Sequence, residues 1–219
     1  MLINQLIESP IVFLAFIFAL VIVLTVHEVA HGVVAYWLGD STAHDQGRLS
    51  FNPLVHIDPV GALMLMTIGF GWGKPVPVDF DRLKYGKWGA VLVAIAGPVS
   101  NLLMVFFFAF IYKMVNPGVN PLMIGEGLSL LHIFLSYAIV YSALLMAFNL
   151  IPIPPLDGSK LLVALLPPSM DYFSVWLSRY GSLLLIGLLI FDSITPSLFG
   201  FSVLSSFFGF VLDKVSLMF

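Results

Sequence analysis

The chain has 219 residues, of which 60% are hydrophobic and 10% are charged, and its formal net charge is −3. A water-soluble domain carries roughly 25% charged residues, so this composition excludes an ordinary soluble fold and indicates a polytopic membrane protein. No basic run or aromatic-rich basic patch predicts nucleic-acid binding, and the absence of cysteine excludes disulfides and thiolate metal ligands.

The first apolar stretch predicts a membrane-spanning helix over residues 10–38. Pro10 suits a helix start, and Gly39-Asp40 ends the apolar pattern. A secretory signal would show a basic segment before this stretch and a small-residue cleavage site after it, and neither is present. The stretch also continues directly into His27-Glu28, so we expect a span that is retained rather than cleaved.

The next segment does not have the length of a full span. Residues 40–59 are polar and broken by prolines, which predicts a loop. Residues 60–72 are apolar but glycine-rich, and they are too short to cross a hydrocarbon layer of about 30 Å. Residues 74–78 cannot be helical because Pro75 and Pro77 interrupt them. We therefore expect a re-entrant element near 60–78 that ends in a strand-like stretch.

Four further apolar stretches complete the predicted bundle. Spans are expected at about 88–112 and 128–150, and a proline cluster ends the second of them. Two later stretches, about 180–191 and 197–212, are separated by Thr195-Pro196. The predicted fold class is all-α integral membrane, a polytopic helix bundle of about five to six spans that forms a single domain over the whole chain.

Basic residues near the span ends predict the orientation, because cytoplasmic loops carry an excess of lysine and arginine. With residues 39–87, 151–179 and the C-terminus on one side, that side holds eight of the nine basic residues and the other holds Lys113 alone. We therefore expect the N-terminus outside and the C-terminus in the cytoplasm. The compact chain and the lack of a targeting segment favour a prokaryotic cell membrane.

Residues 27–31 form the pattern H-E-x-x-H near the cytoplasmic end of the first span. Positions four apart share a face of a helix, so the imidazoles of His27 and His31 can converge on one metal ion. Glu28 lies beside them, where it can take a proton from a metal-bound water. Ionisable groups inside a span indicate a functional site, and the alternative is a hydrogen-bonded polar cluster between helices.

A catalytic zinc ion takes three protein ligands, so a third ligand should come from elsewhere in the chain. His132 lies at the opposite depth and fits a core or interfacial position, and His44 lies in a polar loop. Asp157 follows the third span on the same side as the histidines, after prolines that favour an extended path. It could bind the metal or cap a helix that begins near residue 158, and the pattern does not decide between the two.

Two other polar residues lie in the loop on the same side as the H-E-x-x-H turn. His56 and Asp58, together with Asn52, could line a path for water towards the site. A direct role for His56 is the less favoured interpretation.

Three motifs in this order resemble the site-2 proteases, which are intramembrane zinc metalloproteases. They are His27-Glu28-x-x-His31, Gly97-Pro98-x-x-Asn101 and Asn149-x-x-Pro152-x-Pro154-x-Leu156-Asp157-Gly158, within about residues 20–165. The resemblance implies one zinc ion (Zn2+) per chain, held by His27, His31 and Asp157, with Glu28 as general base.

The resemblance also bears on two asparagines. It implies that Asn149 helps to hold the substrate. For Asn101 we expect packing in a bent or closely packed helix, with substrate contact as the second interpretation. The sequence has no PDZ or nucleotide-sensing domain, so the chain would be a compact member, and family regulation cannot be carried over to it.

Together these observations predict an intramembrane zinc metalloprotease that hydrolyses peptide bonds in or near transmembrane segments. Its partners would be a transmembrane protein substrate and the lipid bilayer. The stretch at 70–78 could pair with an unwound substrate by β-addition, or it could simply pack on the bundle. The alternative function is a zinc-binding membrane protein without proteolysis, such as a metal carrier, which should show ligands at several depths. A non-catalytic scaffold is disfavoured, because Glu28 lies where a base is required.

Overall fold

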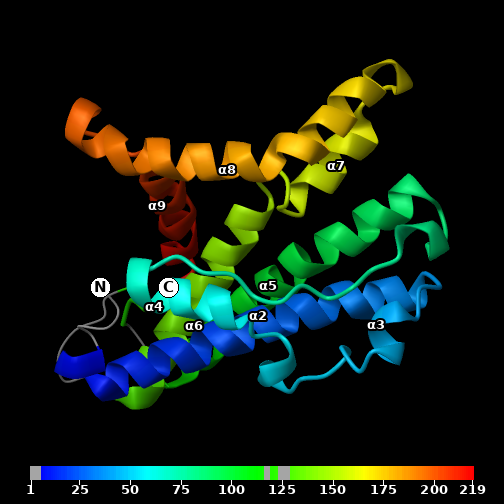
Figure 1. Cartoon of the computed structure of the whole chain (residues 1–219). Coiled ribbons are helices and arrows are strands. Elements are labelled where there is room, and N and C mark those ends of the chain that lie inside the picture. The colour runs from blue at the N-terminus through cyan, green and yellow to red at the C-terminus, as the bar shows by residue number, and fades with distance from the viewer. Residues whose placement is uncertain (1–5, 116–118, 123–128) are drawn as a thin grey trace.

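Figure 1 shows a computed structural model that describes residues 6–115, 119–122 and 129–219. Within these residues the regular secondary structure is helical, and the predicted all-α fold class is confirmed. The longer helices are α2 (Pro10–Trp37), α5 (Lys87–Val115), α6 (Leu130–Asn149) and α8 (Asp171–Phe199). The shorter ones are α3 (Thr42–Asp45), α4 (Pro59–Ile68), α7 (Gly158–Leu165) and α9 (Val203–Ser216), with 3-10 turns η1 (Pro53–Val55), η2 (Phe80–Arg82) and η3 (Pro168–Met170).

Helices α2, α5 and α6 form the core of the bundle, and α7 and α8 form an arm that extends away from it (Figure 1). Small residues at the helix contacts, among them Ala19, Ala109 and Ala143, are almost completely buried. Small side chains let helix backbones approach closely in a membrane, where hydrophobicity does not drive helices together. The core is therefore built for close contact, and the arm stays largely exposed.

Four described helices are long and apolar enough to cross a membrane, and three of them coincide with the first three predicted spans. The predicted break at Thr195-Pro196 is wrong, because α8 runs on to Phe199 and ends at Gly200 in the left-handed conformation. The Thr195 hydroxyl donates to the Asp192 carbonyl at 3.0 Å. This bond replaces the one that Pro196 cannot make, because proline has no backbone N–H.

The last helix differs from the predicted final span. Helix α9 has 14 residues, which is too short for an ordinary crossing. It leads to Phe219, whose ring packs edge-on against Tyr112 with centroids 5.6 Å apart, close to Lys113. The C-terminus therefore lies at the Lys113 end of the bundle. This corrects the predicted placement of the C-terminus beside residues 39–87.

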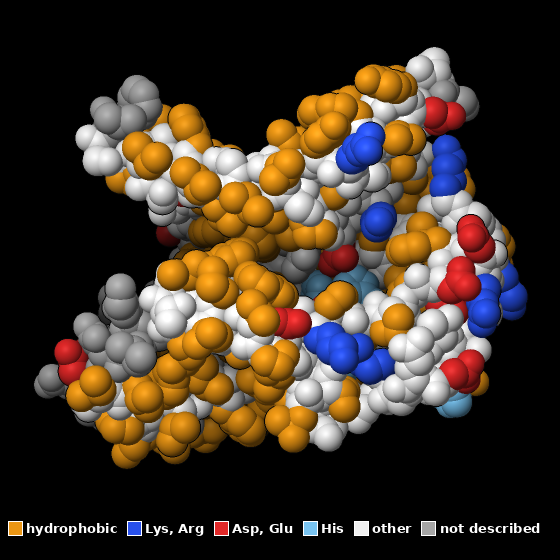
Figure 2. All heavy atoms as spheres, viewed as in Figure 1, with side chains coloured by type: hydrophobic (Ala, Val, Ile, Leu, Met, Phe, Trp, Pro, Cys, Tyr) orange, Lys and Arg blue, Asp and Glu red, His pale blue; other side chains and the backbone are white. Residues whose placement is uncertain are grey.

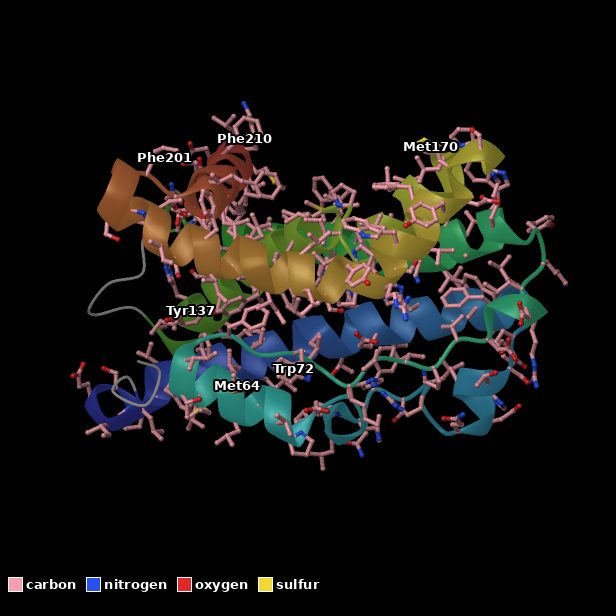
Figure 3. The ribbon with its side chains drawn as sticks, turned by 45° about the horizontal axis from the view of Figure 1, so that its top comes forward. Met64, Trp72, Tyr137, Met170, Phe201 and Phe210 are labelled. Carbon is pink, nitrogen blue, oxygen red and sulfur yellow. The ribbon has the colours of Figure 1, made fainter. Side chains whose placement is uncertain are left out.

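The predicted re-entrant element consists of α4 and an extended return segment, residues 70–79, here called the strap. Asp58 caps α4 by accepting a hydrogen bond from the Gly61 backbone at 2.8 Å, and Gly69 ends the helix. A Cβ atom on Gly61 would overlap the backbone of Trp72, so the strap packs directly on α4. Figure 3 shows Trp72 on the strap and Met64 on α4. The described part of the strap is extended, with a single β-bridge from Gly73 to Ile57.

Asp40 fastens the far end of the strap to the end of α2. Its carboxylate is fully buried and accepts hydrogen bonds from the Thr42 backbone at 3.0 Å and from the Asp79 backbone at 2.8 Å. Burial alone would raise the pKa of Asp40, but these bonds and the one from the Thr42 hydroxyl hold that pKa below its ordinary value of 3.8. The ionised carboxylate thus contributes to stability.

Asp40→Asn should lower the thermal stability of the detergent-solubilised protein at pH 7, by about 1–3 kcal/mol, because an amide cannot accept both sets of bonds. The folded-state pKa is depressed, so this contribution is present above pH 3.8 and is lost as the pH falls through the folded pKa. Thermal unfolding at pH 7 and pH 3 should therefore show a smaller difference between wild type and variant at pH 3. An equal difference at both pH values would contradict this role.

Candidate metal centre

His27 and His31 point into the interior of the bundle from one face of α2. Their side chains are 4% and 11% exposed, and their Nε2 atoms lie 3.1 Å apart. Their positions one helical turn apart account for this convergence. The predicted pairing of the two imidazoles is therefore present in the structure.

Asp157 completes a group of three possible metal ligands. Its Oδ2 atom lies 3.3 Å from Nε2 of His27 and 3.2 Å from Nε2 of His31. One ligand atom from each residue lies within 4.8 Å of the others, and the described residues contain no other such group. Two imidazole nitrogens and one carboxylate oxygen form a donor set typical of a catalytic zinc site.

The open alternative for Asp157 was a helix cap. Asp157 does occupy the position before α7, but its side chain makes no capping hydrogen bond. Its Oδ2 is buried and has no hydrogen-bond partner, although it faces two imidazoles. A buried carboxylate oxygen is costly unless something pairs with it, and a cation between these three side chains would do so. The residues present therefore fit a metal ion.

The hydrogen bond made by Nδ1 of His31 determines which tautomer its ring adopts. Nδ1 lies 2.7 Å from the Val93 carbonyl oxygen, which can only accept, so Nδ1 carries the proton and donates. Nε2 of a neutral His31 then offers its lone pair towards Asp157. This is the arrangement that metal-bound histidines show.

Asn101 plays the equivalent part for His27. The amide nitrogen of Asn101 lies 3.1 Å from Nδ1 of His27, and its amide oxygen is buried without a partner. Turning the Asn101 amide by half a turn lets this oxygen accept from Nδ1–H of His27. Asn101 is completely buried, so the geometry favours orientation of His27 over the substrate contact that was the second prediction for it.

Gly97-Pro98 explains how α5 comes this close to α2. A Cβ atom on Gly97 would overlap ring atoms of both His27 and His31. Pro98 lies in the interior of α5 and has no backbone N–H, so it cannot donate to the Ala94 carbonyl one turn earlier. The motif therefore positions a carbonyl and an amide against the two imidazoles, a role that packing alone would not require.

Glu28 lies next to the three candidate ligands but outside their group. Its Oε2 accepts a hydrogen bond from the Val76 backbone at 2.9 Å, so the strap passes directly over this carboxylate. The side chain is partly buried. A carboxylate held on one oxygen beside a metal-ligand group is available for proton transfer through its other oxygen.

The other loop residues fasten the strap rather than join the ligands. His56 is 1% exposed, and its Nε2 donates to the Ser50 carbonyl at 2.8 Å. Its backbone oxygen accepts from the Lys74 amide at 2.8 Å. Asn52 caps η1 as Asp58 caps α4. A water path lined by these residues stays a prediction.

The remaining candidates lie away from the group. His44 is largely exposed, as predicted, and its ring pairs with Asp45. His132 is buried at the opposite end of the bundle, where its Nε2 lies 2.8 Å from the Tyr112 hydroxyl, in agreement with a core position. Asn149 donates from its amide to the Leu145 carbonyl at 3.1 Å, and its contact with substrate stays a prediction.

The candidate site opens to the protein surface between the core and the arm. Figure 2 shows histidine and acidic side chains at the bottom of a hollow, with basic side chains around its edge. Lys160 of α7 reaches across to η2, where its Nζ lies 5.0 Å from the centre of the Phe80 ring. Water can therefore reach the group from this face.

Known proteins similar to this chain include three that bear the name "Putative zinc metalloprotease". YwhC of Bacillus subtilis is 37% identical over 174 residues, which are 80% of this chain and 79% of YwhC. MJ0611 of Methanocaldococcus jannaschii is 30% identical over 62% of each chain. Rip2 of Mycolicibacterium smegmatis is 27% identical over 80% of this chain and 64% of its own length. No family model and no solved structure matches the chain.

Gly97→Ala should abolish high-affinity metal binding, because the added methyl group occupies the space of the two imidazoles. The measurement is metal content per chain after incubation of the detergent-purified protein with Zn2+ and removal of the excess. Gly187→Ala is the matched control, since a Cβ atom there meets nothing within 4 Å. Wild-type metal content in Gly97→Ala, with helix content unchanged by circular dichroism, would refute this geometry.

Proposed function

This chain belongs to the site-2 protease-like family of zinc metalloproteases, and on that premise we propose that it hydrolyses peptide bonds in or near the transmembrane segments of membrane-protein substrates. The observation that carries the proposal is the meeting of His27, His31 and Asp157 inside the bundle, with Glu28 beside them. The three side chains come from α2 and from the loop before α7, and they meet at one depth.

We assign His27, His31 and Asp157 as the ligands of one zinc ion per chain. The donor set leaves room for a fourth ligand, as catalytic zinc sites require. When bound, zinc supplies Lewis acidity, which lowers the pKa of a water and stabilises negative charge on a carbonyl oxygen. Val93 and Asn101 keep the two imidazoles oriented for this role.

Glu28 acts as the general base in this proposal. It takes one proton from the attacking water as the water oxygen bonds to the peptide carbonyl carbon. It passes that proton to the leaving nitrogen as the C–N bond breaks, which gives a carboxylic acid and an amine. The Val76 hydrogen bond holds the carboxylate in one orientation, so less reorganisation is needed when the proton moves. The role of Asn149 in this scheme is to hold the substrate chain, and its position at the end of α6 supports that role.

A transmembrane helix hides its peptide bonds, so a substrate must unwind before hydrolysis. Residues 74–76 of the strap have no free backbone N–H with which such a substrate could pair by β-addition. The amides of Lys74 and Val76 already donate to His56 and Glu28, and prolines 75 and 77 carry no amide hydrogen. The strap instead supports the site from within the protein.

The single depth of the three ligands favours a protease over a metal carrier. A carrier needs ligands along a path through the bilayer. Among the described residues, the buried histidine at the other end is His132, which is paired with Tyr112.

We place the site towards the cytoplasm of a prokaryotic cell membrane, with the N-terminus outside. Seven of the nine basic residues lie in 39–87 and 151–179, and the other two are Lys113 and Lys214.

Glu28→Gln should reduce cleavage at least a hundredfold while zinc content stays near one per chain, because Gln cannot accept the proton and is not a ligand. The measurement uses full-length protein in proteoliposomes with a panel of single-span test substrates, followed by zinc analysis of the same samples. Glu8→Gln, at an exposed position before the start of α2, is the control and should cleave like wild type. Turnover by Glu28→Gln would show that another group acts as the base.

A further inference from the structure

Arg48 differs from the other described lysine and arginine residues because it is buried, with 9% exposure. No carboxylate pairs with it among the residues that the structure describes. Its Nη2 donates instead to the Lys74 carbonyl at 2.8 Å and to the Pro75 carbonyl at 3.1 Å. A buried cation is costly when it has only neutral partners, so this placement calls for an explanation beyond stability.

The two ends of one peptide unit connect Arg48 to Glu28. The Pro75 carbonyl accepts from Arg48, and the Val76 N–H of the same planar unit donates to Oε2 of Glu28 at 2.9 Å. In a trans peptide the carbonyl and the N–H point in opposite directions. Orienting one end of this unit therefore orients the other.

The prolines on either side make this peptide the one available donor. Neither Pro75 nor Pro77 has a backbone N–H, so between residues 75 and 77 only Val76 can donate to the carboxylate. A positive charge at the carbonyl end polarises the peptide, and hydrogen bonds in such a chain strengthen one another. Arg48 thus makes the Val76 N–H a better donor to Glu28.

Packing against α2 fixes the register of the strap over Glu28. Gly32 lies one turn beyond Glu28, and a Cβ atom on Gly32 would overlap Leu49 and press against Val76. Val76 is 8% exposed. The residue after Arg48 and the residue that donates to Glu28 therefore meet at the same point on α2, which leaves this peptide unit little freedom to shift along the helix.

We infer that Arg48 is a positioning residue for the general base, which it orients through the Pro75–Val76 peptide unit. The inference rests on the proposed function, because it assigns Arg48 a part in the same reaction. Arg48 touches neither the candidate ligands nor, in this scheme, the substrate. Its loss should therefore lower kcat and leave KM and zinc content close to wild type.

Hydrogen–deuterium exchange tests the contact without any cleavage assay. In the full-length detergent-solubilised protein, Arg48→Gln should speed exchange at the Val76 amide at least tenfold, because the peptide unit loses its anchor. The flanking prolines carry no exchanging amide, so in a proteolytic peptide of residues 74–77 the Val76 amide is the one backbone amide that reports exchange. Lys84→Met, which removes an exposed positive charge at the same end of the bundle, is the control. Unchanged exchange at Val76 in Arg48→Gln would overturn the inference.

A double-mutant cycle tests the consequence for catalysis. Arg48→Gln and Val76→Pro should each lower kcat about tenfold to a hundredfold, since each removes one link between Arg48 and Glu28. The kcat of the double variant should be no lower than that of the less active single variant, because both substitutions act through the same hydrogen bond. Arg48→Lys should recover part of the loss, since it keeps the charge and a donor. Independent losses that multiply, or a rise in KM alone, would indicate a merely structural role and overturn the inference.

The outcomes separate this inference from the proposed function. Wild type that cleaves, Glu28→Gln that does not, and Arg48→Gln that cleaves at the wild-type rate would remove Arg48 from the mechanism and leave the protease assignment intact. Wild type that cleaves none of the substrates would overturn the protease assignment and the positioning role together, even where exchange at Val76 responds to Arg48→Gln.

Discussion

Two imidazoles and a carboxylate inside an apolar bundle are costly unless each is compensated, and this requirement shapes the structure around them. His27 and His31 are satisfied on their Nδ1 sides by Asn101 and Val93. Their Nε2 atoms and Asp157 face one another, and the carboxylate oxygen has no hydrogen-bond donor of its own. A divalent cation between these three side chains would offset the free-energy cost of burying the Asp157 carboxylate. Metal binding and the local fold are therefore coupled.

Two neighbouring elements serve this group in different ways. Helix α5 approaches closely because Gly97 has no side chain, and it brings the polar groups that orient the imidazoles. The strap supplies one backbone donor to Glu28 and is fastened by His56, Arg48 and Asp40 at successive points. The two imidazoles are thus oriented from α5, and Glu28, the proposed base, is held from the strap.

The first three spans and the pairing of His27 with His31 could be predicted from the sequence, because both depend on local periodicity. The sequence did not decide whether Asp157 binds a metal or caps α7, because a carboxylate just before a helix can do either. Its direction depends on tertiary packing, including the close contact of Gly181 with Pro154. The contact of Asn101 with His27 and the contacts of Arg48 with the strap could not be predicted for the same reason. Their partners lie 74 and 26 residues away in the sequence. The end of α8 was misplaced because Thr195 compensates for Pro196.

If His27, His31 and Asp157 together hold one zinc ion, the zinc content of the protein should depend on Asp157 as well as on the two histidines. The measurement is zinc per chain in detergent-purified protein, for wild type and for Asp157→Ala, with helix content as the check on folding. We expect about one zinc in wild type and a clear loss in the variant, because two imidazoles alone bind zinc weakly. Wild type without zinc, or a variant with the full amount, would show that these three residues do not form the zinc site.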